Sequence, residues 1–124
     1  AIDFAIDEKG NVYVLFADGT IKEFNGGAEQ PFALTGVPDT KLKSGGALYL
    51  DSSSPLSALY VTDPVDQSVY EFTLAGIFQA RYRASEPLAF AHLSGVFAQG
   101  NNVYVTSGNT LYYFNTTANL APGQ

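Results

Sequence analysis

Short apolar runs recur along the whole chain, and the residues between them are mostly Gly, Pro, Asp, Asn and Ser. The runs are three to six residues long and do not follow the 3.6-residue spacing of an amphipathic helix. Twelve glycines and six prolines fall mainly between the runs, where they favour turns. We therefore predict an all-β protein with almost no helix. The expected strands are 4–6, 12–16, 21–24, 30–34, 47–51, 59–62, 69–74, 77–82, 96–98, 103–106 and 111–114.

A triplet with a central tyrosine occurs three times, as Val12-Tyr13-Val14, Leu59-Tyr60-Val61 and Val103-Tyr104-Val105. The tyrosines lie 47 and 44 residues apart, a period typical of a four-stranded propeller blade. Each triplet is followed by a polar turn and a further run that ends in Phe. These second strands are apolar on both faces, which suits a strand between two neighbouring sheets.

The repeat predicts a single propeller-like domain over residues 1–124. It has three blades of three to four antiparallel strands, and the blade boundaries are 1–40, 41–87 and 88–118, with a polar tail at 119–124. In the first blade, Asp18-Gly19 favours a type I′ hairpin and Gly26-Gly27 interrupts the pattern before an outer strand at Gln30–Leu34. No convincing fourth strand follows Phe114.

The central unit resembles the NHL type of propeller repeat. It reads Leu59-Tyr60-Val61-Thr62-Asp63-Pro64 and then Gln67-Ser68-Val69-Tyr70-Glu71-Phe72. The first unit, from Asp7 to Val14, is similar to the Asp-x-x-Gly-Asn-aliphatic-Tyr-Val opening of that repeat. The resemblance covers nearly the whole chain and implies a propeller fold. Family members commonly carry Asn-Arg where this chain has Gln67-Ser68.

Three blades raise a physical problem, because closed propellers have about 4–8 blades. A three-blade arc leaves two apolar sheet faces uncovered. The chain is then part of a larger ring, or pairs with a copy of itself to make about six blades, or forms an open stack capped by its polar ends. Exposed apolar faces mark interaction sites. We therefore predict a protein partner or self-association, with a homo-oligomer or a fragment of a larger chain as the expected state.

Composition and charge narrow the partners further. Twelve acidic and six basic residues give a net charge of −6, and the basic residues come together only as the pairs Lys41/Lys43 and Arg81/Arg83, so nucleic acid is not expected. No apolar run approaches the ~20 residues that cross a bilayer, so membrane insertion is not expected. Cysteine is absent, which excludes disulfides and thiolate sites, and the absence of Met even at position 1 indicates processing or excision from a longer product.

Candidates for chemistry are few, and we predict no catalytic residue and no cofactor. His92 is the sole histidine and is interpreted as a loop or packing residue. Asp51, Asp63 and Asp66 are the candidates for a hard cation such as Ca²⁺, although aspartates in such turns commonly accept backbone N–H bonds instead.

The sequence also offers candidates for an aromatic binding surface and for a glycosylation site. Tyr49, Tyr112 and Tyr113 are candidates for a ligand or partner surface, with core packing as the alternative. Asn115-Thr116-Thr117 fits the N-glycosylation pattern.

The pattern as a whole favours a non-enzymatic binding or assembly module that acts through blade faces and loops, outside the cell or at its surface. One alternative is a divalent-cation-dependent lactonase- or hydrolase-like propeller, which needs acids in the channel from several blades. Gln99 stands where the other units have Asp7 and Asp51, which speaks against it. The other alternative is a glycan-binding module.

Overall fold

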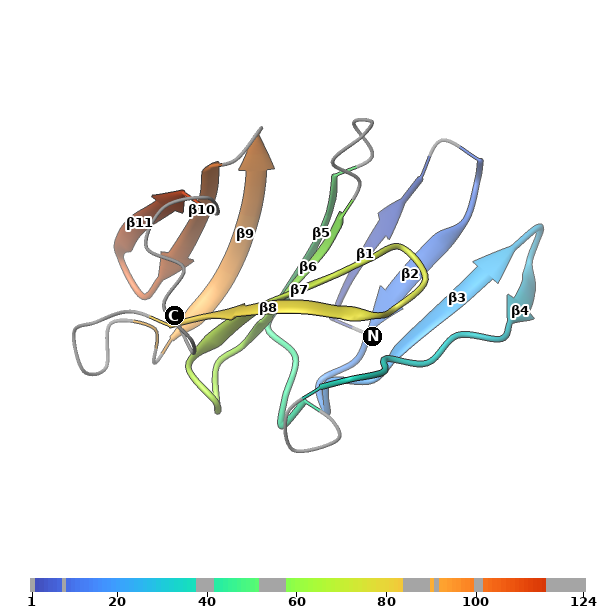
Figure 1. The fold of residues 1–124 in the computed structure, drawn as a ribbon, viewed down its shortest axis with the longest axis horizontal. Helices are drawn as coiled ribbons and strands as arrows, with labels where there is room; N and C mark the ends of the chain where they lie inside the picture. The colour runs from blue at the N-terminus through green and yellow to red at the C-terminus, as the bar shows by residue number, and fades with distance from the viewer. Residues whose placement is uncertain are drawn as a thin grey trace.

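The computed structural model describes residues 2–7, 9–37, 42–51, 58–83, 90, 92–99 and 102–115. Every regular element in these ranges is a β-strand (Figure 1). A helix with the length and apolarity to span a bilayer is not found in this part of the chain. The predicted blade boundaries, at 40/41, 87/88 and 118, and the predicted polar tail at 119–124 lie outside the described residues.

The strands form three separate antiparallel sheets, each a meander. The first sheet contains β1 (Asp3–Ile6), β2 (Val12–Leu15), β3 (Ile21–Asn25) and β4 (Ala28–Gln30). The second contains β5 (Ala47–Asp51), β6 (Ala58–Asp63), β7 (Ser68–Phe72) and β8 (Phe78–Tyr82). The third contains β9 (Leu93–Gln99), β10 (Asn102–Ser107) and β11 (Thr110–Asn115). The prediction of an all-β protein with three to four strands per unit is confirmed.

The sheets stand side by side as a fan, with the second sheet in the middle (Figure 1). Its first strand, β5, contacts β1 on one side and β9 on the other, so the opening strands of all three meanders are neighbours. One of these contacts is a hydrogen bond from the Leu48 N–H to the Asp3 carboxylate at 2.9 Å. This arrangement of strands is the blade order of a propeller.

Two apolar cores separate the three sheets. The first lies between sheets one and two and includes Leu15, Leu59 and Phe72. The second lies between sheets two and three and includes Val69 and Val103. The middle sheet therefore has both faces covered, and all six residues of its second strand, β6, are buried. The prediction that this strand is sandwiched between sheets is confirmed.

The first sheet corrects two predictions about its turns. Gly26 and Gly27 do not interrupt the sheet, because both have positive φ, at 62° and 85°, and form the two-residue turn that joins β3 to β4. The type I′ turn predicted at Asp18-Gly19 is wrong, because only Gly19 has positive φ and the turn is a three-residue loop closed between Phe16 and Thr20.

The outer strand predicted at Gln30–Leu34 is also wrong. The outer strand β4 ends at Gln30, and the chain then leaves the first sheet. Thr35 instead pairs with Ile77 of the second unit: the Thr35 N–H donates to the Gly76 carbonyl and the Phe78 N–H donates to the Thr35 carbonyl, both at 2.9 Å. The connection is thus attached to the neighbouring blade.

Candidate functional site

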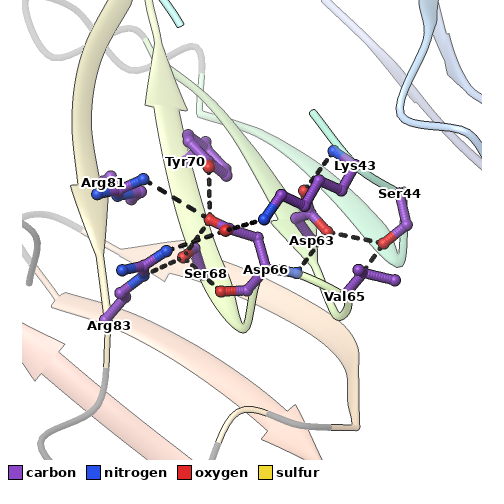
Figure 2. A network of polar contacts seen from close by, with 9 residues as sticks. All are labelled: Lys43, Ser44, Asp63, Val65, Asp66, Ser68, Tyr70, Arg81 and Arg83. Carbon is purple, nitrogen blue, oxygen red and sulfur yellow. Dashed lines mark hydrogen bonds and ion pairs between the residues drawn. The ribbon is translucent and has the colours of Figure 1, made fainter. Parts of the chain in front are cut away.

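The turn between β6 and β7 is organised by the carboxylate of Asp63 (Figure 2). Its Oδ1 accepts the Asp66 N–H at 3.0 Å and the Ser44 hydroxyl at 2.7 Å, and its Oδ2 accepts the Lys43 N–H at 2.8 Å. Asp63 is fully buried, so these bonds replace water around a charged group. The turn residue Gln67 has a φ of 55°. The carboxylate therefore joins the turn to the segment that enters β5.

Asp66 lies at the centre of a larger polar network (Figure 2). Its Oδ2 accepts the Tyr70 hydroxyl at 2.6 Å and the Ser68 hydroxyl at 2.8 Å, and its Oδ1 accepts Arg83 Nη2 at 2.9 Å. The side chains of Lys43 and Arg81 approach the same carboxylate at 3.4 and 3.8 Å. The Asp66 side chain is only 3 % exposed. Lys43 comes from the connection before β5, Arg81 from β8 and Arg83 from the residue that follows β8, so three cations lie near one buried acid.

The surroundings of Asp66 determine its protonation. Burial alone raises the pKa of this carboxyl, but the hydrogen bonds from Tyr70, Ser68 and Arg83 outweigh burial and lower the pKa to about 2 from 3.8. Burial and the bond to Asp66 raise the pKa of Tyr70 to about 12. Asp66 is therefore a charged acceptor and Tyr70 a neutral donor throughout the neutral range.

The three aspartates suggested as cation ligands do not converge. Asp51 lies at the end of β5 that pairs with Ala58, whereas Asp63 lies at the opposite end of β6. The oxygens of Asp63 and Asp66 accept the hydrogen bonds described above. Within the described ranges, no three His, Asp or Glu side chains gather around a common point.

The other predicted site residues are dispersed. His92 is exposed just before β9, and its backbone N–H donates to the Ser107 hydroxyl at 3.2 Å. Tyr49 lies against Phe97 with ring centroids 4.9 Å apart. Tyr112 packs on the second core, whereas Tyr113 is exposed on the other side of β11.

Asn115, the residue of the glycosylation pattern, has a side-chain partner. Its Nδ2 donates to the Asn102 Oδ1 at 3.2 Å. The same pair occurs in the first blade, where Asn25 Nδ2 donates to Asn11 Oδ1 at 2.8 Å. Thr117, which completes the pattern, lies outside the described residues. The side chain of Asn115 therefore takes part in a contact that occurs within both the first and the third blade.

The repeated tyrosine distinguishes the two faces of each sheet. Tyr13 packs in the core between sheets one and two, and Tyr60 packs in the core between sheets two and three. Tyr104 lies between Val103 and Val105, which face the second core, so it points to the free side of sheet three. We call the side that bears the tyrosine the forward face, and the other side the backward face.

The forward face of sheet three is exposed where the same face of the other sheets is buried. In each blade, the residue two positions after the tyrosine pairs with an aliphatic residue on the next strand: Ile21, Val69 and Leu111. Ile21 is 5 % exposed and Val69 is 0 % exposed, but Leu111 is 65 % exposed. Phe97 and Tyr113 are also exposed on this face. The forward face of sheet three therefore lacks the cover that the others have.

On the backward face of sheet one, apolar residues are exposed at positions where equivalent residues of the other sheets are buried. The residue after each tyrosine pairs with Phe4, Leu48 and Val96 in the three blades, and the residue before it pairs with Ile6, Leu50 and Ala98. Phe4 is 63 % exposed and Ile6 is 58 % exposed, whereas Leu48 is 5 % exposed and Ala98 is 3 % exposed. The arc thus ends in two apolar faces that are buried wherever a neighbouring blade is present.

An aromatic row crosses the forward face of sheet three. Phe97 contacts Tyr49 and Tyr104, with ring centroids 4.9 and 6.4 Å apart, and Tyr104 contacts Tyr113 at 5.9 Å. The row joins β5 of the middle sheet to β11 at the edge of the third. Sequence reasoning missed it because the partners lie on four strands. The repeated tyrosine, combined with the alternation of side chains along a strand, was the signal that could have found it.

Comparison with known proteins supports the propeller class. No protein-family model matches the chain, and a search of curated proteins also finds no match. Among solved structures, a streptogramin B lyase aligns with a TM-score of 0.63 and 18 % identity over 92 % of this chain and 40 % of that one. Virginiamycin B lyase from Staphylococcus aureus aligns with a TM-score of 0.61 and 17 % identity over 98 % of this chain and 42 % of that one.

These alignments show a β-propeller fold, since the three sheets match part of a β-propeller lyase. The chain spans about two fifths of the length of the lyases that it matches. Identity at this level shows the fold alone. The propeller class implied by the resemblance to the NHL repeat is confirmed, and no family model supports the NHL family itself.

Proposed function

We propose that the chain is a non-enzymatic assembly module whose two open faces bind blades of its own kind. The observation that carries this proposal is the difference in exposure between equivalent residues. Leu111 is 65 % exposed, although Ile21 and Val69 are buried at the same position of the other blades. The same apolar position is therefore present in every blade, and it is buried in each blade whose forward face is covered by a neighbour.

Burial energy supports the same function. Covering a large apolar side chain is worth about 1.5–3 kcal/mol, and each end face has at least two such side chains that are more than half exposed. They are Phe4 and Ile6 at one end, and Leu111 and Tyr113 at the other. Contiguous apolar surface of this kind is typical of association sites.

The polar network of the middle blade has a structural role in this proposal. Asp66 already accepts three hydrogen bonds, and its lowered pKa of about 2 makes it a poor general base. Arg83 and Tyr70 are both engaged with it. The network therefore holds the turn and the outer strand of the middle blade in place.

Sedimentation velocity over a wide range of protein concentration tests the proposal. The wild-type chain is expected to associate, and the double variant Ile6→Glu/Leu111→Glu is expected to sediment as a monomer, since each glutamate places a charge in the apolar contact. Val65→Glu is the matched control, because Val65 is as exposed as Leu111 but lies in the β6–β7 turn. A wild-type chain that stays monomeric at the highest concentration contradicts the proposal.

A further inference from the structure

We infer that Lys43, Arg81 and Arg83 form an oxyanion site around Asp66, and that this site binds a phosphate group or another tetrahedral dianion. The site is distinct from the two end faces of the proposed function. It lies where the middle blade faces the first one, because Tyr70, which binds Asp66, packs in the core between sheets one and two.

The middle blade and the connection before it build this site. Arg81 of β8 pairs with Tyr70 of β7, so both side chains lie on the backward face of sheet two. Arg83 follows two residues later and lies on the same side. Lys43 comes from the connection that enters β5. Both neighbours of the middle blade are present, so the site does not depend on the uncovered ends of the arc.

Positive charge exceeds negative charge here, although the chain as a whole is acidic. The chain has six basic residues, and three of them approach the carboxylate of Asp66. Asp66 balances one of the three charges, and among the described residues no second carboxylate forms an ion pair with any of these cations. Two positive charges therefore remain unbalanced at close range, where like charges repel. A bound dianion would balance both.

The cations are open to solvent, whereas the acid is not. The Asp66 side chain is 3 % exposed, but the side chains of Lys43 and Arg83 are 53 % and 41 % exposed. An anion that arrives from solvent therefore meets the cations before it meets the carboxylate. Asp66 lies among them and holds them together (Figure 2).

Donor groups of these cations remain after Asp66 has bound them. Arg83 donates through Nε to Ser68 and through Nη2 to Asp66, and its Nη1 makes no hydrogen bond within the described part of the chain. Arg81 Nε is buried and also lacks a hydrogen-bond partner among the described residues, so Asp66 alone does not satisfy this guanidinium. Guanidinium and ammonium groups are common partners of phosphate oxygens.

Charge and shape favour a tetrahedral dianion over a carboxylate. A phosphate group carries close to two negative charges slightly above neutral pH and has oxygens on several sides. A carboxylate has one charge and two oxygens in a plane. Three cations that reach the site from different positions can each contact a different oxygen of a tetrahedral ion. Sulfate shares this charge and shape, so the site should accept it as well.

Titration of the isotope-labelled chain with inorganic phosphate, followed in amide NMR spectra slightly above neutral pH, tests the site. Saturable changes are expected at Lys43 and at residues 66–68 and 81–83. Sodium sulfate should produce the same changes, and sodium chloride at matched ionic strength should not. Sodium acetate should bind at least about 10-fold more weakly, because it offers one charge and fewer acceptor oxygens.

Charge-removing variants locate the binding residues. Lys43→Gln should weaken phosphate binding about 3-fold, since this cation is half exposed, and Arg83→Gln should weaken it at least about 10-fold. Lys9→Gln is the matched control, because it removes one exposed positive charge from the turn between β1 and β2 and should leave binding unchanged. Thermal unfolding checks that each variant is folded. Lys43→Gln keeps the test valid if Arg83→Gln does not fold, because no hydrogen bond from Lys43 Nζ is found within the described ranges.

Several results would overturn the site while leaving the proposed function in place. Chloride that reproduces the spectral changes, or changes that do not saturate, would show only general screening of charge. An equal loss of binding in Lys43→Gln and Lys9→Gln would show that the cluster is not the site. Acetate that binds as tightly as phosphate, or sulfate that fails to bind, would refute the tetrahedral dianion as the ligand.

Discussion

The hydroxyl of Tyr70 donates a 2.6 Å hydrogen bond to the Oδ2 of Asp66, across the turn that joins β6 to β7. Both residues are buried, and Tyr70 also belongs to the core between sheets one and two. The hydrogen bond thereby links the charged carboxylate of the turn to the apolar core. Arg83, which follows β8, binds the same carboxylate at 2.9 Å, so the network joins the inner turn to the outer strand of the blade.

Replacing Asp66 with Asn should destabilise the fold. The substitution removes the charge that pairs with Arg83 and leaves buried donors without an ionised acceptor, so the free energy of unfolding should fall by about 2–4 kcal/mol. Urea unfolding at neutral pH measures the change. Asp18→Asn is the control, because Asp18 is exposed in a turn and should cost under about 0.5 kcal/mol. Equal effects of the two substitutions would show that the network contributes nothing.

Stability should also depend on pH through Asp66. The carboxyl has a pKa of about 2 in the folded chain against 3.8 as its ordinary value. A lowered folded pKa means that the unfolded chain binds the proton more readily, so the stabilisation is complete above about pH 4 and is lost as the pH falls toward 2. The loss should be roughly 2 kcal/mol. Urea midpoints measured from pH 5 to pH 2 should fall less steeply for Asp66→Asn than for the wild type.

Matched truncations at one repeat position should differ between blades. Ile21→Ala removes a side chain that is 5 % exposed and should cost about 2–4 kcal/mol, whereas Leu111→Ala removes one that is 65 % exposed and should cost under about 1 kcal/mol at concentrations where the chain is monomeric. Thermal unfolding at two protein concentrations measures both effects. The cost of Leu111→Ala should rise at the higher concentration if the forward face is covered by association. A constant, small cost at all concentrations would argue against that contact.

Gly46 lies where the second blade packs closely against the third. A Cβ at this position would lie 2.6 Å from the Thr62 hydroxyl and 2.8 Å from the Leu93 carbonyl oxygen. Gly46→Ala should therefore cost about 1–3 kcal/mol by overpacking. Gly108→Asn serves as the control, since nothing lies within 4 Å of a Cβ there and Asn tolerates its φ of 59°. Chemical denaturation compares the two variants, and an unaffected Gly46→Ala chain would show that the blades can move apart at little cost.

The sequence was sufficient for the fold because its decisive signal is local and repeated. The triplets around Tyr13, Tyr60 and Tyr104 predicted three second strands, and the alternation of apolar residues predicted strands on either side. The turns were harder to predict. Two glycines at 26 and 27 end a strand as readily as they form a tight hairpin, and only the pairing of Phe24 with Glu29 distinguishes the two outcomes.

The polar network was not predictable in the same way. Lys43, Arg81 and Arg83 come from a connection and from an outer strand, and they reach Asp66 only because the meander folds back on itself. The spacing of Arg81 and Arg83 does place both on one face of a strand, which is a signal that sequence reasoning passed over. Where the NHL repeat commonly has arginine, this chain has Ser68. The guanidinium of Arg83, which follows β8, donates to the Ser68 hydroxyl at 2.9 Å.

The burial of β6 along its whole length has a consequence for how such chains change over evolution. The middle blade presents a forward face to one neighbour and a backward face to the other. Duplication of a unit of this kind would place each new blade between surfaces that already suit it. Chains of this architecture can therefore gain or lose whole blades while the number of uncovered faces stays at two.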